Sequence, residues 1–203
     1  GSGISEIVRL VLNPIWNAFH FFTLYANADG YRARIRTDST DVLDRYILAK
    51  THDLVQEMTG EMDDYDLFGA CGAVRSFLDA LTNWYVRRSR DRFWAGDQDA
   101  IDTLHTVLSL LCRVLAAFLP LTTEAVYRGL TGERSVHLTD WPDAATVPCD
   151  PSLVESMDLA RDVCSSTLRV RKEQKLRVRL PLASLHVAVA ASSRLAPFTE
   201  LIA

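Results

Sequence analysis

Apolar residues recur every three or four positions along most of the chain, and short polar or glycine-containing breaks separate these stretches. The two clearest stripes consist of Leu67, Cys71, Val74, Leu78, Leu81 and Tyr85, and of Ile101, Leu104, Leu108, Leu111, Leu115 and Phe118. This spacing is typical of helices that bury one face in a bundle. We therefore predict helices over residues 5–28, 41–62, 63–94, 100–118, 122–132 and 152–175.

Proline and hydroxyl residues indicate where some of these helices begin. Pro14 either starts the first helix or kinks one that already runs from Ser5, because proline has no backbone N–H to donate. Ser39 or Thr40 is expected to cap the second helix. Residues 152–155 have the spacing of a capping box ahead of the last helix.

The pattern changes after Pro181, where Leu185, Val187 and Val189 alternate with smaller or polar residues. Such alternation indicates a half-buried strand. The predicted fold class is all-α, a helical bundle with a short C-terminal β element. We expect residues 1–3 to be a remnant of cloning, residues 4–148 to form the bundle, and residues 149–203 to hold the last helix, a basic segment and the start of a junction strand.

Residues 81–94 have the most distinctive composition, with two tryptophans, a tyrosine, a phenylalanine and four arginines. Guanidinium groups match phosphate geometry and aromatic rings stack on bases, so this composition suits a nucleic-acid surface. A buried ion-pair layer uses the same residue types. Periodicity has to separate the two uses.

The apolar stripe that ends at Tyr85 leads at helical spacing to Arg88, and Arg92 lies close to it. Arg87 and Arg90 point away from this stripe. We therefore expect Arg88 and Arg92 to face inward and Arg87 and Arg90 to face outward, where they are candidates for phosphate contacts.

A buried guanidinium without a partner would be costly, so Arg88 requires a carboxylate from a neighbouring helix. Asp44 is the proposed partner in this structural ion pair. Trp84 lies beside the stripe, which favours packing in the core over stacking on a base.

The formal net charge of −4 is unevenly distributed. Residues 161–179 contain seven basic and two acidic residues, a local charge of +5, which leaves −9 for the rest of the chain. A basic face on an acidic body would orient a polyanion. The strongest electrostatic candidates are Lys172, Lys175, Arg177 and Arg179, although Glu173 among them is equally consistent with an ordinary exposed face.

Composition indicates a soluble globular region: 203 residues with 48% hydrophobic content can bury a sizeable core. The four cysteines are far apart and the five histidines lack metal-ligand spacing, so we expect reduced thiols and no metal site. Polar residues interrupt the apolar stretch 7–26, which argues against a membrane span. No motif for a catalytic residue is present.

Six ordered motifs resemble one enzyme family. Residues 81–94 resemble the segment NWYIRRSR.RFW of bacterial isoleucyl-tRNA synthetases, and residues 13–27 are similar to PLWNAY.FF..YAN. The remaining four are residues 43–48 (LDRWIL, with Tyr46 in place of tryptophan), 118–127 (FLPF.AEE.Y), 135–142 (SVHL.DWP) and 171–182 (RKE..L.VRQPL, with Leu180 in place of glutamine). Several motifs are shared with the valyl and leucyl enzymes, and residues 81–94 and 135–142 favour the isoleucyl family.

The resemblance implies the helical anticodon-binding domain of a class Ia aminoacyl-tRNA synthetase. The intact enzyme would charge isoleucine tRNA with isoleucine, using ATP and Mg²⁺, as a monomer in the cytoplasm. The adenylation signatures HIGH and KMSKS do not occur in this chain, so the chain alone should be catalytically inactive, with no cofactor and tRNA as its partner. In related synthetases, polar and aromatic residues of the bundle meet the anticodon, which adds Asn17, Tyr25 and Asn27 as candidates; Asn27 could instead cap its helix.

Two hypotheses remain from the sequence. The first is an RNA-recognition domain of an isoleucyl enzyme, or of a valyl or leucyl relative. The second is a free-standing helical protein-interaction module whose basic segment contacts an acidic partner. The ordered set of motifs favours the first.

Overall fold

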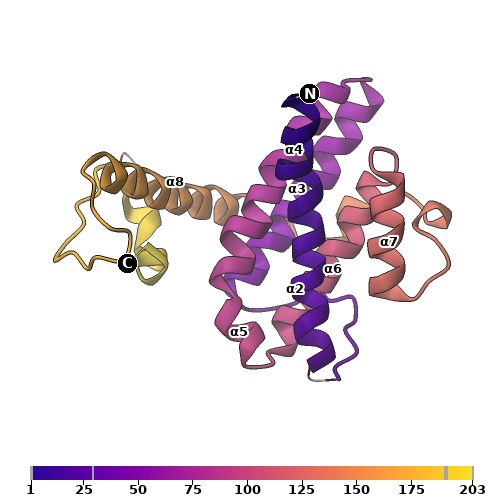
Figure 1. Cartoon of the computed structure of the whole chain (residues 1–203), viewed down its shortest axis with the longest axis horizontal. Helices are drawn as coiled ribbons and strands as arrows, with labels where there is room; N and C mark the ends of the chain where they lie inside the picture. Colours follow the sequence, from indigo (N-terminus) through magenta and orange to yellow (C-terminus); the bar gives the residue numbers. More distant parts are fainter. Residues whose placement is uncertain (1, 29, 190–191, 203) are drawn as a thin grey trace. The chain divides into compact units, whose positions relative to one another are not determined.

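Helices form the regular structure of a computed structural model that describes residues 2–28, 30–189 and 192–202 (Figure 1). The predicted all-helical fold is therefore confirmed. The chain separates into a first unit, Gly1–Cys149, and a second unit, Asp150–Ala203. Gly1 of the predicted cloning remnant lies outside the described residues.

The first unit is a bundle in which α2, α3, α4, α6 and α7 run alongside one another (Figure 1). Its elements are α1 (Ser2–Ile7), η1 (Val8–Leu12), α2 (Asn13–Ala28), α3 (Val42–Asp63), α4 (Leu67–Asp79), η2 (Ala80–Val86), α5 (Arg90–Trp94), α6 (Gln98–Leu115), α7 (Pro120–Thr131), η3 (Val136–Leu138) and η4 (Ala144–Thr146). The elements η1 and η2 are π-helical turns, and η3 and η4 are short 3₁₀ turns.

Helix α6 is the centre of the bundle, because it packs against α2, α3, α5 and α7. Nearly all of its residues are buried, including Ile101, Leu104 and Leu108, so it is buried on every side and not along one stripe. Polar side chains on α6, among them Asp102 and His105, are therefore buried as well. Such groups need hydrogen-bond partners from the surrounding chain.

The first helix runs through Pro14 and does not begin there. Helix α1 continues through η1 into α2, and the backbone N–H of Asn13 bonds to the carbonyl of Val8 in the wider π-helical pattern. Because Pro14 has no N–H, the chain loses one helical hydrogen bond at this point, and π turns are common where the ladder is disturbed.

Aspartate residues cap four of the long helices described, α3, α4, α6 and α8 (Pro151–Glu173). The side chain of Asp41 accepts from the N–H groups of Leu43 and Asp44 at the start of α3. The prediction of Ser39 or Thr40 as the cap is wrong, because Ser39 is buried and donates to Asp44 instead. Asp97 caps α6 and Asp150 caps the last long helix in the same manner.

The long helix predicted over residues 63–94 is interrupted. Asp66 caps a helix that begins at Leu67, and Tyr65 before it adopts a left-handed conformation with φ of 58°. The helix then widens into η2 and bends at Ser89 before α5 begins. These breaks decide which arginines of the stretch face the core.

The second unit consists of α8 (Pro151–Glu173), η5 (Ser192–Phe198) and α9 (Thr199–Ile202). Met157, Ala160 and Val163 on α8 are buried, as are Leu195 and Phe198 on η5, and α8 packs against both η5 and α9. Because Asp150 caps α8 and Pro151 occupies its first turn, the helix begins before the capping box predicted at residues 152–155.

The C-terminal strand prediction is wrong, since no strand occurs in the ranges that the structure covers. Leu185 and Val187 are more than one-third exposed and not half-buried by a sheet. A strand requires a neighbour for its backbone hydrogen bonds, and alternation in one segment cannot supply it. No helix within the described ranges is long and apolar enough to cross a membrane.

Candidate nucleic-acid interface

The arginine-rich stretch turns one position away from the expected face. Leu81, Tyr85, Ser89 and Phe93 are buried at intervals of four, whereas uninterrupted α-helical spacing leads from Tyr85 to Arg88. The π turn η2 contains an additional residue, which rotates the following residues by about 100° around the axis. Arg88 is accordingly exposed, whereas Arg92 faces the buried side as predicted.

Arg92 binds three carboxylates at once. Its Nη1 and Nη2 donate to Asp44 Oδ1 and Oδ2, each over 2.8 Å, and its Nε donates to Asp97 over 2.8 Å. Its Nη1 also lies 2.9 Å from Asp41 Oδ1. Since Asp41 and Asp97 cap α3 and α6, Arg92 connects α5 to the starts of two other helices.

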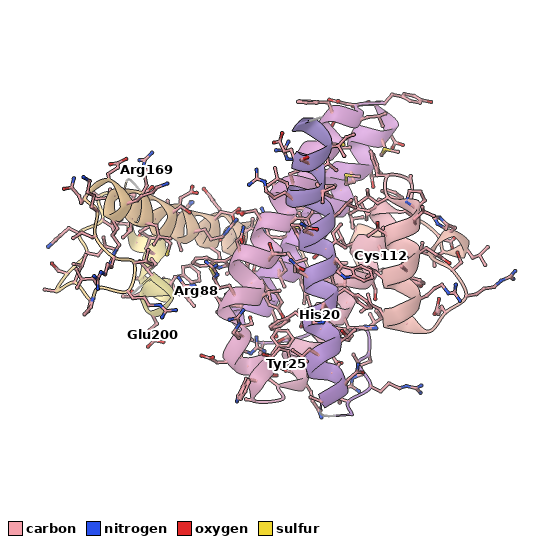
Figure 2. All side chains as sticks on the ribbon, in the orientation of Figure 1. His20, Tyr25, Arg88, Cys112, Arg169 and Glu200 are labelled. Atoms are coloured by element: carbon pink, nitrogen blue, oxygen red, sulfur yellow. The ribbon has the colours of Figure 1, made fainter. Side chains whose placement is uncertain are left out.

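The expected partnership of Arg88 with Asp44 is therefore corrected to Arg92 with Asp44. Asp44 is fully buried and also accepts from the hydroxyl groups of Ser39 and Tyr85. Arg88 is exposed, and its guanidinium carbon lies 4.6 Å from the ring centre of Trp84 (Arg88 is labelled in Figure 2). Trp84 is 6% exposed, so its predicted place in the core is confirmed.

Ionisation in this cluster follows from burial and charge pairing. Burial and the adjacent Asp44 carboxylate raise the pKa of Tyr85 well above its ordinary value, so its hydroxyl remains a hydrogen-bond donor. Burial raises the pKa of Asp97, but the hydrogen bond and charge of Arg92 outweigh this and lower it overall. The cluster is a structural anchor that joins α3, α5 and α6.

A cleft of about 1090 Å³ opens on the first unit between the end of α2, residues 30–37, α6 and α7. Arg32, Arg34 and Arg113 line it, together with a single carboxylate, Glu133. Ligand clefts typically measure roughly 300–1,000 Å³, so this one has room for a nucleotide-sized group. Its charge favours an anionic ligand.

Residues 31–36, which we call the arginine loop, are held against α6 by main-chain hydrogen bonds. The backbone N–H of Arg34 donates to Asp102 Oδ1 over 2.9 Å, and that of Arg36 donates to Thr106 Oγ1 over 2.8 Å. The Tyr31 hydroxyl and Arg34 Nε donate to Asp102 Oδ2 over 3.0 and 3.2 Å. Arg32 and Arg34 are left exposed on a loop whose backbone is fixed.

Two buried polar side chains of α6 lie one turn apart in the lining of this cleft, His105 and Ser109. Burial lowers the pKa of His105, against the opposing effects of the Leu130 carbonyl and Asp102. Nδ1 of His105 is buried and has no hydrogen-bond partner among the described residues.

The sequence interpretation missed the arginine loop, although the chain contains a signal for it. Arg32, Arg34 and Arg36 occupy every second position within five residues, in a loop and not on a helix. When charge is summed over a longer stretch of sequence, Asp38 and Asp41 offset these arginines and the cluster is not apparent. The net charge of residues 32–36 alone would have identified it.

The predicted candidates of the first unit lie in different places. Arg87 and Arg90 are exposed, as their helical angles predicted. Asn27 lines the cleft, whereas Asn17 lines a separate groove between α2 and α4. Tyr25, labelled in Figure 2, is partly exposed and packs against Phe21 and Phe93 with ring centres 4.7 and 6.1 Å apart.

The four candidate cations of the second unit lie in one short segment. Lys172, Lys175, Arg177 and Arg179 are all exposed at the end of α8 and in the residues that follow it. Arg169 on the same helix lies 4.0 Å from Glu173. The structure thus contains two arginine- and lysine-rich surfaces, one in each unit.

The family model of the anticodon-binding domain of tRNA ligases matches residues 44–188, most of both units. The chain belongs to this family. The match includes α6 and α7, which line one side of the cleft, and α8 with the C-terminal basic surface, whereas the end of α2 and the arginine loop precede it.

Curated relatives of this anticodon-binding domain are isoleucine–tRNA ligases. The chain is 55% identical over 201 residues to that of Nocardia farcinica, covering 99% of this chain and 19% of the relative. It is 57% identical over 203 residues to that of Corynebacterium efficiens and 56% identical over 200 residues to that of Mycobacterium tuberculosis, in each case covering 98% of this chain and 19% of the relative. The chain thus spans about a fifth of the length of these relatives.

Proposed function

We propose that this domain recognises isoleucine tRNA for an isoleucine–tRNA ligase, and that the cleft with its arginine loop receives the anticodon region. The observation that carries the proposal is the fixed arginine loop, which presents Arg32 and Arg34 at a nucleotide-sized cleft. The choice of isoleucine as the amino acid rests on the names of the relatives, which are isoleucine–tRNA ligases.

Phosphate binding follows from the exposed cations. Arg32 and Arg34 at the cleft, and Arg87 and Arg90 on the arginine-rich stretch, have guanidinium groups available to solvent. Guanidinium forks bind phosphate oxygens, and such contacts supply most of the affinity and salt dependence of RNA binding. Lys172, Lys175, Arg177 and Arg179 provide the same chemistry in the second unit.

Base recognition follows from the shape and polarity of the cleft. Sequence-specific RNA recognition targets unstacked bases, whose edges then bond to polar groups. Asn27 at the cleft provides both amide donors and an amide acceptor for such an edge. The surrounding arginines would position the adjoining phosphates.

Catalysis is assigned to other parts of the parent enzyme. ATP, Mg²⁺ and isoleucine belong to its adenylation chemistry, and no cluster of three or more His, Cys, Asp or Glu side chains suited to a metal occurs in the described part of this chain. Burial raises the pKa of Cys112, labelled in Figure 2, to about 12, so this thiol is protonated at neutral pH. We propose that the domain works as a monomer in the cytoplasm.

The test is binding of an isoleucine tRNA transcript to the 203-residue chain across a series of salt concentrations. The double variant Arg32→Ala/Arg34→Ala should bind more weakly and flatten the plot of log affinity against log salt by roughly 1.4–1.8, from two lost contacts. The matched control is Arg128→Ala/Arg134→Ala, which removes the same charge from exposed positions in a separate groove of the first unit.

A transcript with an exchanged anticodon completes the experiment. We expect it to bind the parent chain more weakly than the native transcript. Equal affinity for the two transcripts would contradict anticodon recognition, and equal losses in the two double variants would contradict the assignment of the cleft.

A further inference from the structure

The end of α8 folds back on itself around one guanidinium. Arg171 Nη1 donates to the backbone carbonyl oxygens of Arg177, Val178 and Leu180 over 3.2, 3.2 and 2.8 Å. The backbone carbonyl of Arg171 also accepts from the N–H of Leu176 over 2.8 Å. Side chain and main chain of one residue thus close residues 172–180, which we call the basic loop.

The turn inside the basic loop contains a backbone outlier. Lys175 has φ of 55°, in the left-handed region that glycine adopts most readily. Its N–H bonds to the carbonyl of Lys172, and that of Leu176 to Arg171, which together form a Schellman motif with Lys175 at the position usually occupied by glycine. A lysine in this place carries a steric cost, and such outliers often mark functional positions.

The charges of the basic loop are available for a ligand. Lys172, Lys175, Arg177 and Arg179 are exposed, and no ion pair joins them to an acidic side chain within the residues described. Glu173 is the single acidic residue of the loop and its ion-pair partner is Arg169. The cations therefore lie on a closed backbone without internal neutralisation.

We propose that Arg171 is a positioning residue for tRNA binding, which clamps the basic loop so that its four cations form a preorganised phosphate-binding surface. The proposal rests on the proposed function and assigns Arg171 a role different from that of its neighbours. Its guanidinium is engaged with three carbonyl oxygens and does not contact phosphate. Preorganisation strengthens binding because the loop need not be ordered when RNA arrives.

The experiment separates geometry from charge with three variants of the 203-residue chain. Arg171→Ala removes the clamp and one charge, whereas Arg171→Lys retains the charge but replaces the planar fork by a single ammonium group. Arg169→Ala is the matched control, because it removes one charge from an exposed position on the same helix. Binding of the isoleucine tRNA transcript is measured across a salt series. Amide hydrogen exchange is measured without RNA at Leu176 and Leu180, whose N–H groups donate to the carbonyls of Arg171 and Arg177.

We expect both Arg171 variants to weaken binding about tenfold and Arg169→Ala to weaken it by no more than about threefold. Arg171→Lys should keep the parent's salt slope, because no phosphate contact is lost, whereas Arg177→Ala should flatten it by roughly 0.7–0.9. Exchange of the Leu176 and Leu180 amides should accelerate in both Arg171 variants and keep the parent's rate in Arg169→Ala.

Lys175→Gly tests the turn itself. It relieves the left-handed conformation and removes one cation, so hydrogen exchange should stay slow while the salt slope falls by roughly 0.7–0.9. An unchanged slope would contradict a phosphate contact at this position.

Two outcomes would overturn the clamp: parent-like tRNA affinity in Arg171→Lys and Arg171→Ala, or unchanged hydrogen exchange in the loop. A parent chain that shows no affinity for the transcript would instead overturn the proposed function, and the exchange data would still report on the clamp.

Discussion

The arginine loop and the basic loop are held in place by opposite kinds of hydrogen bond. In the arginine loop, the carboxylate of Asp102 accepts from a backbone N–H, a hydroxyl and a guanidinium. In the basic loop, the guanidinium of Arg171 donates to three backbone carbonyls. Asp102 is fully buried on the central helix α6, whereas Arg171 lies half-buried at the end of α8.

This difference in burial determines how each loop is coupled to the fold. An anchor in the core cannot be released without disturbing the packing around it, so the arginine loop should remain closed until the bundle unfolds. An anchor at a helix end can open locally at little cost to the rest of the unit. The comparison therefore predicts global effects for changes in the bundle and local effects for changes at Arg171.

The largest effect is expected at the most buried ion cluster of the bundle. Arg92→Ala should lower the free energy of unfolding by about 3–5 kcal/mol, because it leaves the buried Asp44 without its cation. Arg88→Ala should cost about 0.5–1 kcal/mol, since this exposed guanidinium lies over Trp84. Urea unfolding measures both. If both variants lower the free energy of unfolding equally, the assignment of Arg92 as the inward arginine is wrong.

An intermediate effect is expected at the clamp of the arginine loop. Asp102→Ala should cost about 1–3 kcal/mol, because donors of the loop lose their buried acceptor. Asp99→Ala is the control, since this partly exposed carboxylate pairs with Arg36 and should contribute about 0–1 kcal/mol. If urea unfolding gives Asp102→Ala no larger cost than the control, the core does not anchor the loop.

The smallest effect concerns pH and the cleft floor. Burial lowers the pKa of His105 below its ordinary 6.5, so the unfolded chain binds a proton at this site more readily than the folded chain. The resulting stability is complete above pH 6.5 and is lost as pH falls towards the folded-state pKa. His105→Gln should reduce the fall in melting temperature between pH 7.5 and 5. An identical fall in both proteins would contradict the neutral assignment.

Much of the bundle could be predicted from the sequence, because its helices carry strong local signals. The spacing of Ile101, Leu104 and Leu108 identifies α6, and its predicted range of 100–118 is close to the observed Gln98–Leu115. The predicted second helix, residues 41–62, corresponds to Val42–Asp63. The spacing of apolar residues indicates which positions of a helix are buried, so these two helices could be predicted from it.

The candidate site was predicted less completely, for physical reasons that differ between residues. The arginine loop depends on Asp102, which lies 71 positions after Tyr31, and no local pattern indicates that bond. Arg92 was placed inward correctly, whereas Arg88 was placed inward because ideal α-helical geometry was assumed across the π turn η2. In the sequence Arg171 cannot be distinguished from its basic neighbours, and only the folded loop shows that its guanidinium donates to backbone carbonyls.

The sequence by itself determined the family, the helical class and the basic character of residues 171–179, because motifs, periodicity and charge are local properties of the chain. The tertiary structure decided which cations are anchors and which remain exposed. Arg92 and Arg171 became anchors because folding places carboxylates or carbonyl oxygens around them, while Lys175 and Arg177 remain in solvent. That distinction depends on which acceptors each guanidinium meets, and those acceptors are brought together only by the fold.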